Sequence, residues 1–308
     1  MSTSGGTRAI IAALSANLGI AVVKFIAAFF SGSASMVAEG VHSLADSANQ
    51  VLLLIGGRRS RRAADDEHPF GFGRSRYVYA FVVSIILFSV GGVFSLYEGY
   101  EKIVEPHPLE IPWLPVLVLV IAIALESFSL RTAVKEANHT RGDQSWVQFV
   151  RRAKAPELPV VLLEDVAALI GLVLALGGVG LSWATGDGLW DGIGTLAIGV
   201  LLVAVAVVLG IETSSLLVGE GASRSDRGKI AAALVASPGI DSVIHMKTLY
   251  LGPDELLVGA KVALPAAATL AEISATIDMA EERIRAAVPV ARVIYIEPDV
   301  LRQPAPTS

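Results

Sequence analysis

The fold is decided by residues 36–50, MVAEGVHSLADSANQ, in which an apolar segment acquires ionisable side chains. These side chains belong to Glu39, His42 and Asp46. A charged group near the centre of a bilayer costs about 2.5–3.5 kcal/mol, so it persists in a spanning helix where it faces the bundle interior or a water-filled path. Because spacings of three and four residues return to one side of a helix, the three groups share a face. The stretch therefore predicts a membrane helix with a polar stripe turned towards other helices.

The polar stripe has the composition of half a metal site. An imidazole and a carboxylate four residues apart, those of His42 and Asp46, are both ordinary ligands of zinc and neighbouring divalent metals. The alternative interpretation is that these groups join helices within the membrane through hydrogen bonds. Both interpretations place the stripe in the interior of a bundle.

The composition is that of an integral membrane protein. Of 308 residues, 53% are hydrophobic and 17% are charged, and the mean hydropathy is +0.62. The chain has no cysteine, so any metal must be held by histidine and carboxylate groups. The net charge of -5 and the lack of a basic tract with interleaved aromatics argue against nucleic acid as a partner. The N-terminus shows no small-residue cleavage pattern, so no cleaved signal is expected.

Six apolar stretches are long enough to span a membrane, which takes about 20 helical residues. They lie near residues 9–30, 33–55, 77–99, 113–134, 159–181 and 190–212. The connections after the second and fourth stretches are rich in arginine and are called the Arg-rich connections below. Their basic residues are Arg58, Arg59, Arg61, Arg62, Arg74 and Arg76, and Arg131, Lys135, Arg141, Arg151, Arg152 and Lys154. We therefore expect a multi-pass protein of the cell (inner) membrane. By the positive-inside rule, the Arg-rich connections and both termini are expected on the cytoplasmic side.

Several other ionisable groups fall within the predicted spans. Lys24 lies seven residues after Asn17 on the same helical face, and we expect it to form a structural ion pair, to snorkel, or to take part in a transport path. Glu126 is expected to have a structural role near the cytoplasmic end of the fourth span. Glu164 and Asp165 lie deep in the fifth span, about 100° apart around the helix, and Asp165 is the stronger candidate for facing the second span.

After Glu212 the composition becomes that of a soluble domain. Hydrophobic periodicity predicts, in order, a helix, two strands joined by a Gly-Pro-Asp turn, a long amphipathic helix and a final strand. Their ranges are 226–236, 242–250, 255–263, 269–287 and 292–297. This αββαβ order suits an open sheet with helices on one face. The expected organisation is an α-helical six-helix transmembrane domain (1–215), a cytoplasmic α/β domain (216–300) and a disordered tail (301–308).

Several short motifs follow one another along the chain. They are HSLAD in the second span, HPFGFGRSRY before the third, SLYEGYEKI at its end, EDVAAL in the fifth, DGIG in the sixth and the αββαβ tail. Over essentially its whole length the chain resembles the cation diffusion facilitator family of metal transporters, in particular the branch related to zinc transporter 9. The resemblance implies a homodimer of six-helix protomers with a cytoplasmic ferredoxin-like domain. It also implies export of zinc or a similar ion in exchange for protons.

The resemblance implies a specific set of metal ligands. In the family, two side chains four residues apart on the second span and two on the fifth form the transport site. The matching positions are His42, Asp46 and Asp165, while the first position of the fifth span is occupied by Val161, which cannot ligate a metal. The candidates to complete the site are Glu164, Glu39, Asn49 and a water molecule.

Two further metal sites of the family are expected to be weak or absent. In the loop before the third span, Asp65 and His68 match two positions, but the third is Phe72, and His68 is better suited to organising the turn. In the soluble domain the sole histidine is His245, and a position that can be histidine in the family is Ile296. A regulatory dinuclear site is therefore not expected.

These observations predict proton-coupled efflux of a divalent cation from the cytoplasm, with Zn2+ as the expected ion and no cofactor. Mn2+, Fe2+ or Co2+ remains an alternative ion, because an oxygen-rich site suits them as well. A non-transporting metal-sensing scaffold is a second alternative, favoured by Val161. An intramembrane metalloenzyme would need a catalytic arrangement such as HExxH, which the sequence lacks, so the protein is not expected to be an enzyme.

Overall fold

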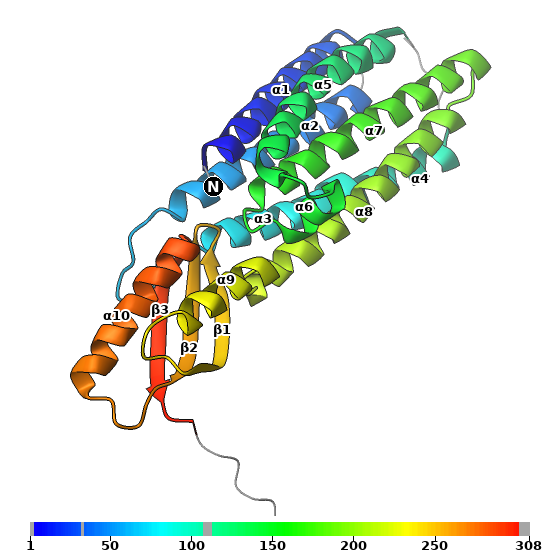
Figure 1. The fold of residues 1–308 in the computed structure, drawn as a ribbon. Helices are drawn as coiled ribbons and strands as arrows, with labels where there is room; N and C mark the ends of the chain where they lie inside the picture. The colour runs from blue at the N-terminus through cyan, green and yellow to red at the C-terminus, as the bar shows by residue number, and fades with distance from the viewer. Residues whose placement is uncertain (1–2, 32–33, 107–112, 302–308) are drawn as a thin grey trace, which may run out of the picture. The chain divides into compact units, whose positions relative to one another are not determined.

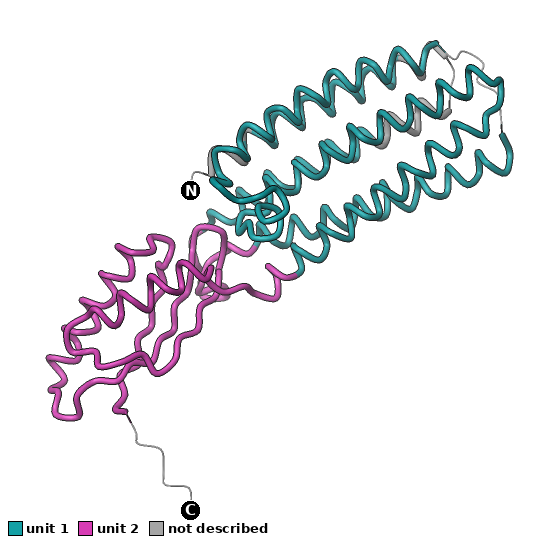
Figure 2. The backbone as a smooth tube through the Cα atoms, turned by 45° about the vertical axis from the view of Figure 1, so that its right-hand side comes forward, with its two compact units in different colours: residues 1–62, 75–214 teal, residues 63–74, 215–308 magenta. Residues whose placement is uncertain are grey.

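The computed structural model describes residues 3–31, 34–106 and 113–301. Within these ranges, the side chains of residues 3–6, 8, 27–28, 30–31 and 34–42 fall outside the description. The chain divides into two compact units (Figure 2). Unit 1 comprises Met1–Arg62 and Ser75–Ser214, and unit 2 comprises Ala63–Arg74 and Ser215–Ser308. The predicted disordered tail, 301–308, lies outside the described residues except for its first residue.

Unit 1 is a bundle of long helices (Figure 1). The spans are α1 (Thr3–Ser31), α2 (Ala34–Arg59), α3–η1–α4 (Ser75–Ile86, Leu87–Val93 and Phe94–Val104), α5 (Trp113–Arg141), α7 (Glu157–Thr185) and α8 (Leu189–Val218). Among the described residues, five of these spans are long and apolar enough to cross a membrane. The sixth, α2, is 26 residues long but less apolar, because it carries the polar stripe. The predicted multi-pass helical architecture is confirmed.

The third span is continuous but changes its winding in the middle. Its central segment η1 is π-helical, and the residues at both joins, Ile86 and Phe94, keep right-handed helical backbone angles. A π-helical turn is rare in helices and is frequent at functional sites. Two buried glycines of η1, Gly91 and Gly92, leave room for another helix to approach.

That neighbouring helix is α8, which lies in backbone contact with the third span. A Cβ atom added at Gly99 would lie 2.5 Å from the backbone N of Leu196, and one added at Gly199 would lie 2.7 Å from the backbone N of Leu96. Each helix therefore presents a glycine where the other presents a leucine. Small residues allow membrane helices to pack at this distance. The third span and α8 consequently form one tightly packed pair.

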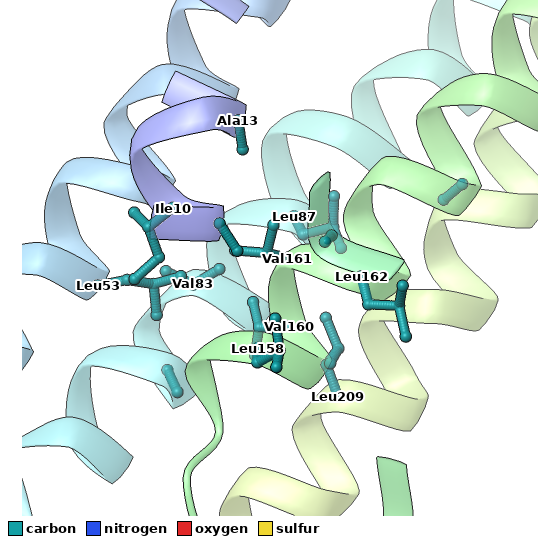
Figure 3. Packing of buried hydrophobic residues seen from close by; sticks show 14 of the residues in the cluster. Ile10, Ala13, Leu53, Val83, Leu87, Leu158, Val160, Val161, Leu162 and Leu209 are labelled. Atoms are coloured by element: carbon teal, nitrogen blue, oxygen red, sulfur yellow. The ribbon is translucent and has the colours of Figure 1, made fainter. Parts of the chain in front are cut away.

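The largest apolar cluster of unit 1 lies at the helix ends that adjoin the Arg-rich connections. We call ten of its large aliphatic members the apolar plug, and Figure 3 labels most of them. They are Ile10, Leu53, Val83, Leu87, Leu158, Val160, Val161, Leu162, Leu202 and Leu209. All are at most 7% exposed. These side chains come from α1, α2, α3, η1, α7 and α8, and those of α7 lie in its first two turns.

A short helix, α6 (Trp146–Arg152), precedes α7 and was not anticipated from the sequence. It begins with a capping box, in which Ser145 Oγ accepts a hydrogen bond from Gln148 N and the Gln148 side chain accepts one from Ser145 N. The Ser-x-x-Gln pattern was the available signal. Hydrophobic periodicity did not reveal this helix, because it has only seven residues.

Unit 2 contains a mixed three-stranded sheet in the order β1-β2-β3. Its elements are α9 (Arg224–Val235), β1 (Ser242–Gly252), β2 (Glu255–Ala263), α10 (Leu270–Ala287) and β3 (Ala291–Asp299). The strands β1 and β2 pair antiparallel across a tight turn, whereas β2 and β3 pair parallel and are joined by α10. One apolar core includes residues of α9, α10 and all three strands. The predicted αββαβ order is confirmed.

The contact between the third span and α8 leads to a first prediction. Replacing Gly99 by Ala should lower the melting temperature in detergent, because the new Cβ would overlap Leu196 and overpacking costs about 1–3 kcal/mol. Gly177→Ala is the matched control, since no atom lies within 4 Å of its added Cβ. There, alanine should leave stability unchanged or raise it by about 0.5–1 kcal/mol. Equal shifts in the two variants would contradict the packing argument.

Candidate metal centre

A cavity of about 150 Å³ lies within unit 1. It is lined from α1, α2, η1, α4, α5, α7 and α8, and is large enough to hold several water molecules. Its ionisable lining residues are Lys24, Asp46, Lys102, Glu126, Glu164, Asp165 and Asp191. Four of these carboxylates, from α2, α5 and α7, therefore line one cavity inside a membrane bundle, and the fifth is that of Asp191 on α8.

Glu164 is held by two amides of α2. Asn49 Nδ2 donates to Glu164 Oε1 and Gln50 Nε2 donates to Glu164 Oε2, each at 3.2 Å. One amide on each oxygen fixes the orientation of the carboxylate and points it at α2. The amide oxygen of Asn49, which is 1% exposed, accepts no hydrogen bond within the described part of the chain. A buried amide oxygen of this kind can serve as an oxygen ligand for a cation.

Asp165 faces a different neighbour. Its Oδ2 accepts a hydrogen bond of 2.8 Å from Ser129 Oγ on α5, and the residue is 1% exposed. The expectation that Asp165 is the acid facing the second span is therefore corrected, because the acid bonded to α2 is Glu164. The reason is geometric: adjacent residues are about 100° apart on a helix, so the two acids reach different helices. Both nevertheless line the cavity.

Glu126 is a cavity residue that the sequence analysis underrated. It is 2% exposed and lines the same cavity as Glu164 and Asp165, although we expected a structural role near the cytoplasmic end of the span. Two signals could have found it. An acid in a membrane span is costly wherever it lies, and Glu126 is three residues before Ser129, on one face of α5.

Polar residues of α1 complete the wall of the cavity. The Lys24 ammonium group donates to Ser43 Oγ on α2 at 3.0 Å, and the residue is 4% exposed. Asn17 Nδ2 donates to Gln50 Oε1 at 3.3 Å. Since Gln50 also donates to Glu164, one chain of hydrogen bonds links α1, α2 and α7. Lys24 thus adds a positive charge to a cavity that is otherwise rich in acids.

His42 and Glu39 lie in α2, but their side chains fall outside the described residues. The helical backbone places His42 one turn before Asp46 on the same face. Among the side chains that the structure describes, no group of three or more His, Cys, Asp or Glu residues is arranged to hold a metal ion. The ligand set predicted from the sequence therefore stays a prediction.

Val161 lies one turn before Asp165, at the position where members of the resembled family are expected to carry a metal ligand. It is 0% exposed and belongs to the apolar plug, beside Leu87 and Leu162 in Figure 3. The position is filled by close apolar packing. Any fourth ligand must accordingly come from another residue or from water.

The loop-site candidates form a local turn in unit 2. Asp65 Oδ1 accepts a hydrogen bond of 2.8 Å from His68 N and lies 3.2 Å from His68 Nδ1. The His68 ring packs on Phe72 with a centroid distance of 4.4 Å. Together these contacts shape the turn between α2 and α3. A metal at this pair stays a prediction.

Comparison with known proteins identifies the family. A family model described as the cation efflux transmembrane domain matches residues 10–218. The proton-coupled zinc antiporter SLC30A9, mitochondrial, of Xenopus laevis is 32% identical over 241 residues, covering 78% of this chain and 43% of the relative. The human protein of the same name is 31% identical over 241 residues, with 78% and 42% covered.

A bacterial relative matches over more of its own length. The cation-efflux pump FieF of Klebsiella pneumoniae is 28% identical over 251 residues, covering 82% of this chain and 79% of the relative. The chain thus spans less than half of the antiporters and most of the bacterial pump. Because the family model covers most of unit 1, the chain belongs to the cation efflux family.

Proposed function

We propose that this protein exports a divalent transition-metal cation, with Zn2+ as the preferred ion, from the cytoplasm in exchange for protons. The observation that carries the proposal is the cavity inside the membrane bundle, lined by the carboxylates of Asp46, Glu126, Glu164 and Asp165. Membership of the cation efflux family supports it, as do relatives named proton-coupled zinc antiporters. Those relatives are transporters by name, which favours transport over an intramembrane enzyme.

The proposed ion site joins α2 and α7. His42 and Asp46 would contribute from α2, and Asp165 and Glu164 from α7. Zinc in proteins takes four nitrogen, sulfur or oxygen ligands, and this chain offers nitrogen and oxygen. Ser129 orients Asp165, and the amides of α2 orient Glu164, as outer partners orient metal ligands in general. Glu39, the amide oxygen of Asn49 or a water molecule would complete the coordination.

Proton coupling follows from the chemistry of such ligands. A protonated imidazole or carboxylic acid does not bind a metal ion as the deprotonated group does, so protons and metal compete for the site. With both Arg-rich connections in the cytoplasm, metal would load from that side and protons would enter from the other. The transporter needs two conformations with different access to the cavity for this exchange to move ions.

Purified protein in vesicles provides the direct test. Zn2+ uptake driven by a pH gradient, and abolished when the gradient is collapsed, is the expected result. Mn2+, Fe2+ and Co2+ in the same assay decide between the alternative ions, because oxygen-rich sites favour Mn2+ and Fe2+. No uptake of any of the four ions would favour the metal-sensing scaffold.

The role of Glu164 is open to a direct test. Glu164→Gln removes the charge and keeps the shape, so transport should fall by about tenfold or more, as for a lost ligand or its partner. The loss should be at least as large as in Glu39→Gln. Glu101→Gln is the matched control, because Glu101 is exposed near the end of α4 and should not matter. Unchanged Zn2+ affinity in Glu164→Gln, together with a loss in Asp165→Ala, would remove Glu164 from the site.

The pH dependence should report His42, the one histidine in a predicted span. An imidazole in water has a pKa of about 6.5, and only the neutral form binds a metal. Transport should therefore fall steeply when the pH on the loading side drops below that range. His42→Asp should shift the fall to lower pH, because a carboxylate loses its proton at lower pH. An identical pH profile in this variant would assign the coupling to another group.

We also propose that the protein is a homodimer whose association does not depend on metal. In unit 2 the sheet face opposite the buried residues of β2 includes Tyr295, which is 60% exposed and offers an aromatic contact to a partner. The part of unit 2 after Ser215 has a single histidine, His245, and so lacks the histidine cluster that could bridge protomers through metal. Light scattering of detergent-purified protein should give a dimer before and after treatment with a strong chelator. Dissociation to monomers on chelation would contradict this.

A further inference from the structure

Among the described residues, those that line the cavity continue from the carboxylates towards one end of the bundle. Starting from the four carboxylates, its wall continues with Ser95 and Lys102 on the third span, Pro115 near the start of α5 and Asp191 near the start of α8. Lys102, Pro115 and Asp191 lie at the helix ends remote from the Arg-rich connections, and Ser95 lies further inside the third span. At this end, Lys102 Nζ lies 3.1 Å from Asp191 Oδ2 and 3.5 Å from Glu98 Oε1.

The opposite end of the cavity is closed by the apolar plug. Leu87 and Leu202 belong both to the cavity wall and to the plug, so they form the floor between the two. Beyond them, Val83 and Leu158 are 0% and 5% exposed and continue the packing towards the Arg-rich connections. A hydrated metal ion cannot pass through side chains packed in this way. The bundle is therefore closed on the side of the Arg-rich connections.

A buried ion pair closes the same end of the bundle. Arg76 near the start of α3 and Glu157 at the start of α7 have side chains that are 11% and 6% exposed. Arg76 Nη2 donates to Glu157 Oε2 at 2.8 Å, and Arg76 Nε donates to Glu157 Oε1. A two-pronged contact between guanidinium and carboxylate is a strong and directional form of ion pair. If either partner moves away, the other remains as an uncompensated buried charge.

The pair joins α3 to α7, which make few other contacts with each other, since α3 packs mainly on α2, and α7 on α5 and α1. Arg76 belongs to the third span, which is held to α8 by the contacts at Gly99 and Gly199. Glu157 belongs to α7, whose acids are tied to α2 and α5 by hydrogen bonds. Separation of α3 from α7 at this end would break the ion pair and open the plug. That movement breaks neither the bond between Asn49 and Glu164 nor that between Ser129 and Asp165, because α3 takes part in neither.

We propose that the ion pair between Arg76 and Glu157 is the latch of the gate on the side of the Arg-rich connections, and that it opens in every cycle to admit metal. This inference rests on the proposed function for its role in transport. The latch controls access to the cavity, and this access can be measured without any transport. Arg76 and Glu157 are in this sense positioning residues, because they act through the plug.

Sided labelling of single cysteines tests the latch, because the chain has no cysteine of its own. Val83→Cys reports on the plug and Ser95→Cys on the open part of the cavity. A membrane-impermeant maleimide is applied from either side of vesicles of known orientation. With the latch intact, Ser95→Cys should react from the side remote from the Arg-rich connections, and Val83→Cys should react slowly from both sides.

Breaking the latch should reverse this pattern. In Glu157→Gln, Val83→Cys should react at least tenfold faster from the side of the Arg-rich connections, while Ser95→Cys reacts more slowly from the other side. The double exchange Arg76→Glu with Glu157→Arg should restore slow labelling at Val83→Cys. Glu212→Gln is the matched control, because Glu212 pairs with the 72% exposed Arg151 in unit 1 and should change neither rate. Unchanged rates at both reporters in Glu157→Gln would overturn the proposal.

If Glu157→Gln unfolds the protein, both reporters react faster and the labelling cannot test the latch. A second measurement then decides. The variant with Arg76→Cys and Glu157→Cys is bridged by a short, reducible thiol crosslinker. If the pair must open, metal uptake should stop on bridging and return on reduction of the same sample. Uptake that is indifferent to the bridge would overturn the latch. Correct labelling changes in a protein that transports no metal would instead contradict the proposed function and leave the latch standing.

Discussion

The placement of four carboxylates around one cavity within a membrane bundle is the constraint on which the rest of this structure depends. Each of these groups would be costly next to lipid, so the helices must enclose them and supply polar partners. Ser129 of α5 bonds Asp165, and the amides of Asn49 and Gln50 on α2 bond Glu164. The arrangement of α2, α5 and α7 therefore follows from the need to solvate these acids with protein groups and cavity water.

Helix α7 belongs both to the packed end of the bundle and to the wall of the cavity. The start of α7 is apolar, from Leu158 to Leu162, and packs into the plug, whereas Glu164 and Asp165 follow directly and line the cavity. The change from packed to open interior thus occurs within about one helical turn. Because the closed end includes the contact between α7 and α3, the proposed gate would open by a separation of these two helices. The ion pair between Arg76 and Glu157 sits where that separation would begin.

The sequence predicted the architecture well, because hydrophobic length and periodicity depend on neighbouring residues alone. It indicated six spans, the αββαβ order of the soluble part and the polar stripe of residues 36–50. It also singled out Glu164 and Asp165, since acids within an apolar run are visible without any knowledge of the fold. The family resemblance, carried by short ordered motifs, pointed to the family that the comparison with known proteins identifies.

The sequence by itself determined which residues share a face of one helix, but not which neighbour that face meets. Only the tertiary structure decided that Glu164 turns to α2 and Asp165 to α5, that Glu126 joins the same cavity, and that Val161 is packed in the plug. The same holds for Arg76 and Glu157, which are 81 residues apart in the chain. Helical periodicity acts over a few residues, whereas such contacts are set by how whole helices pack, and no local pattern records that packing.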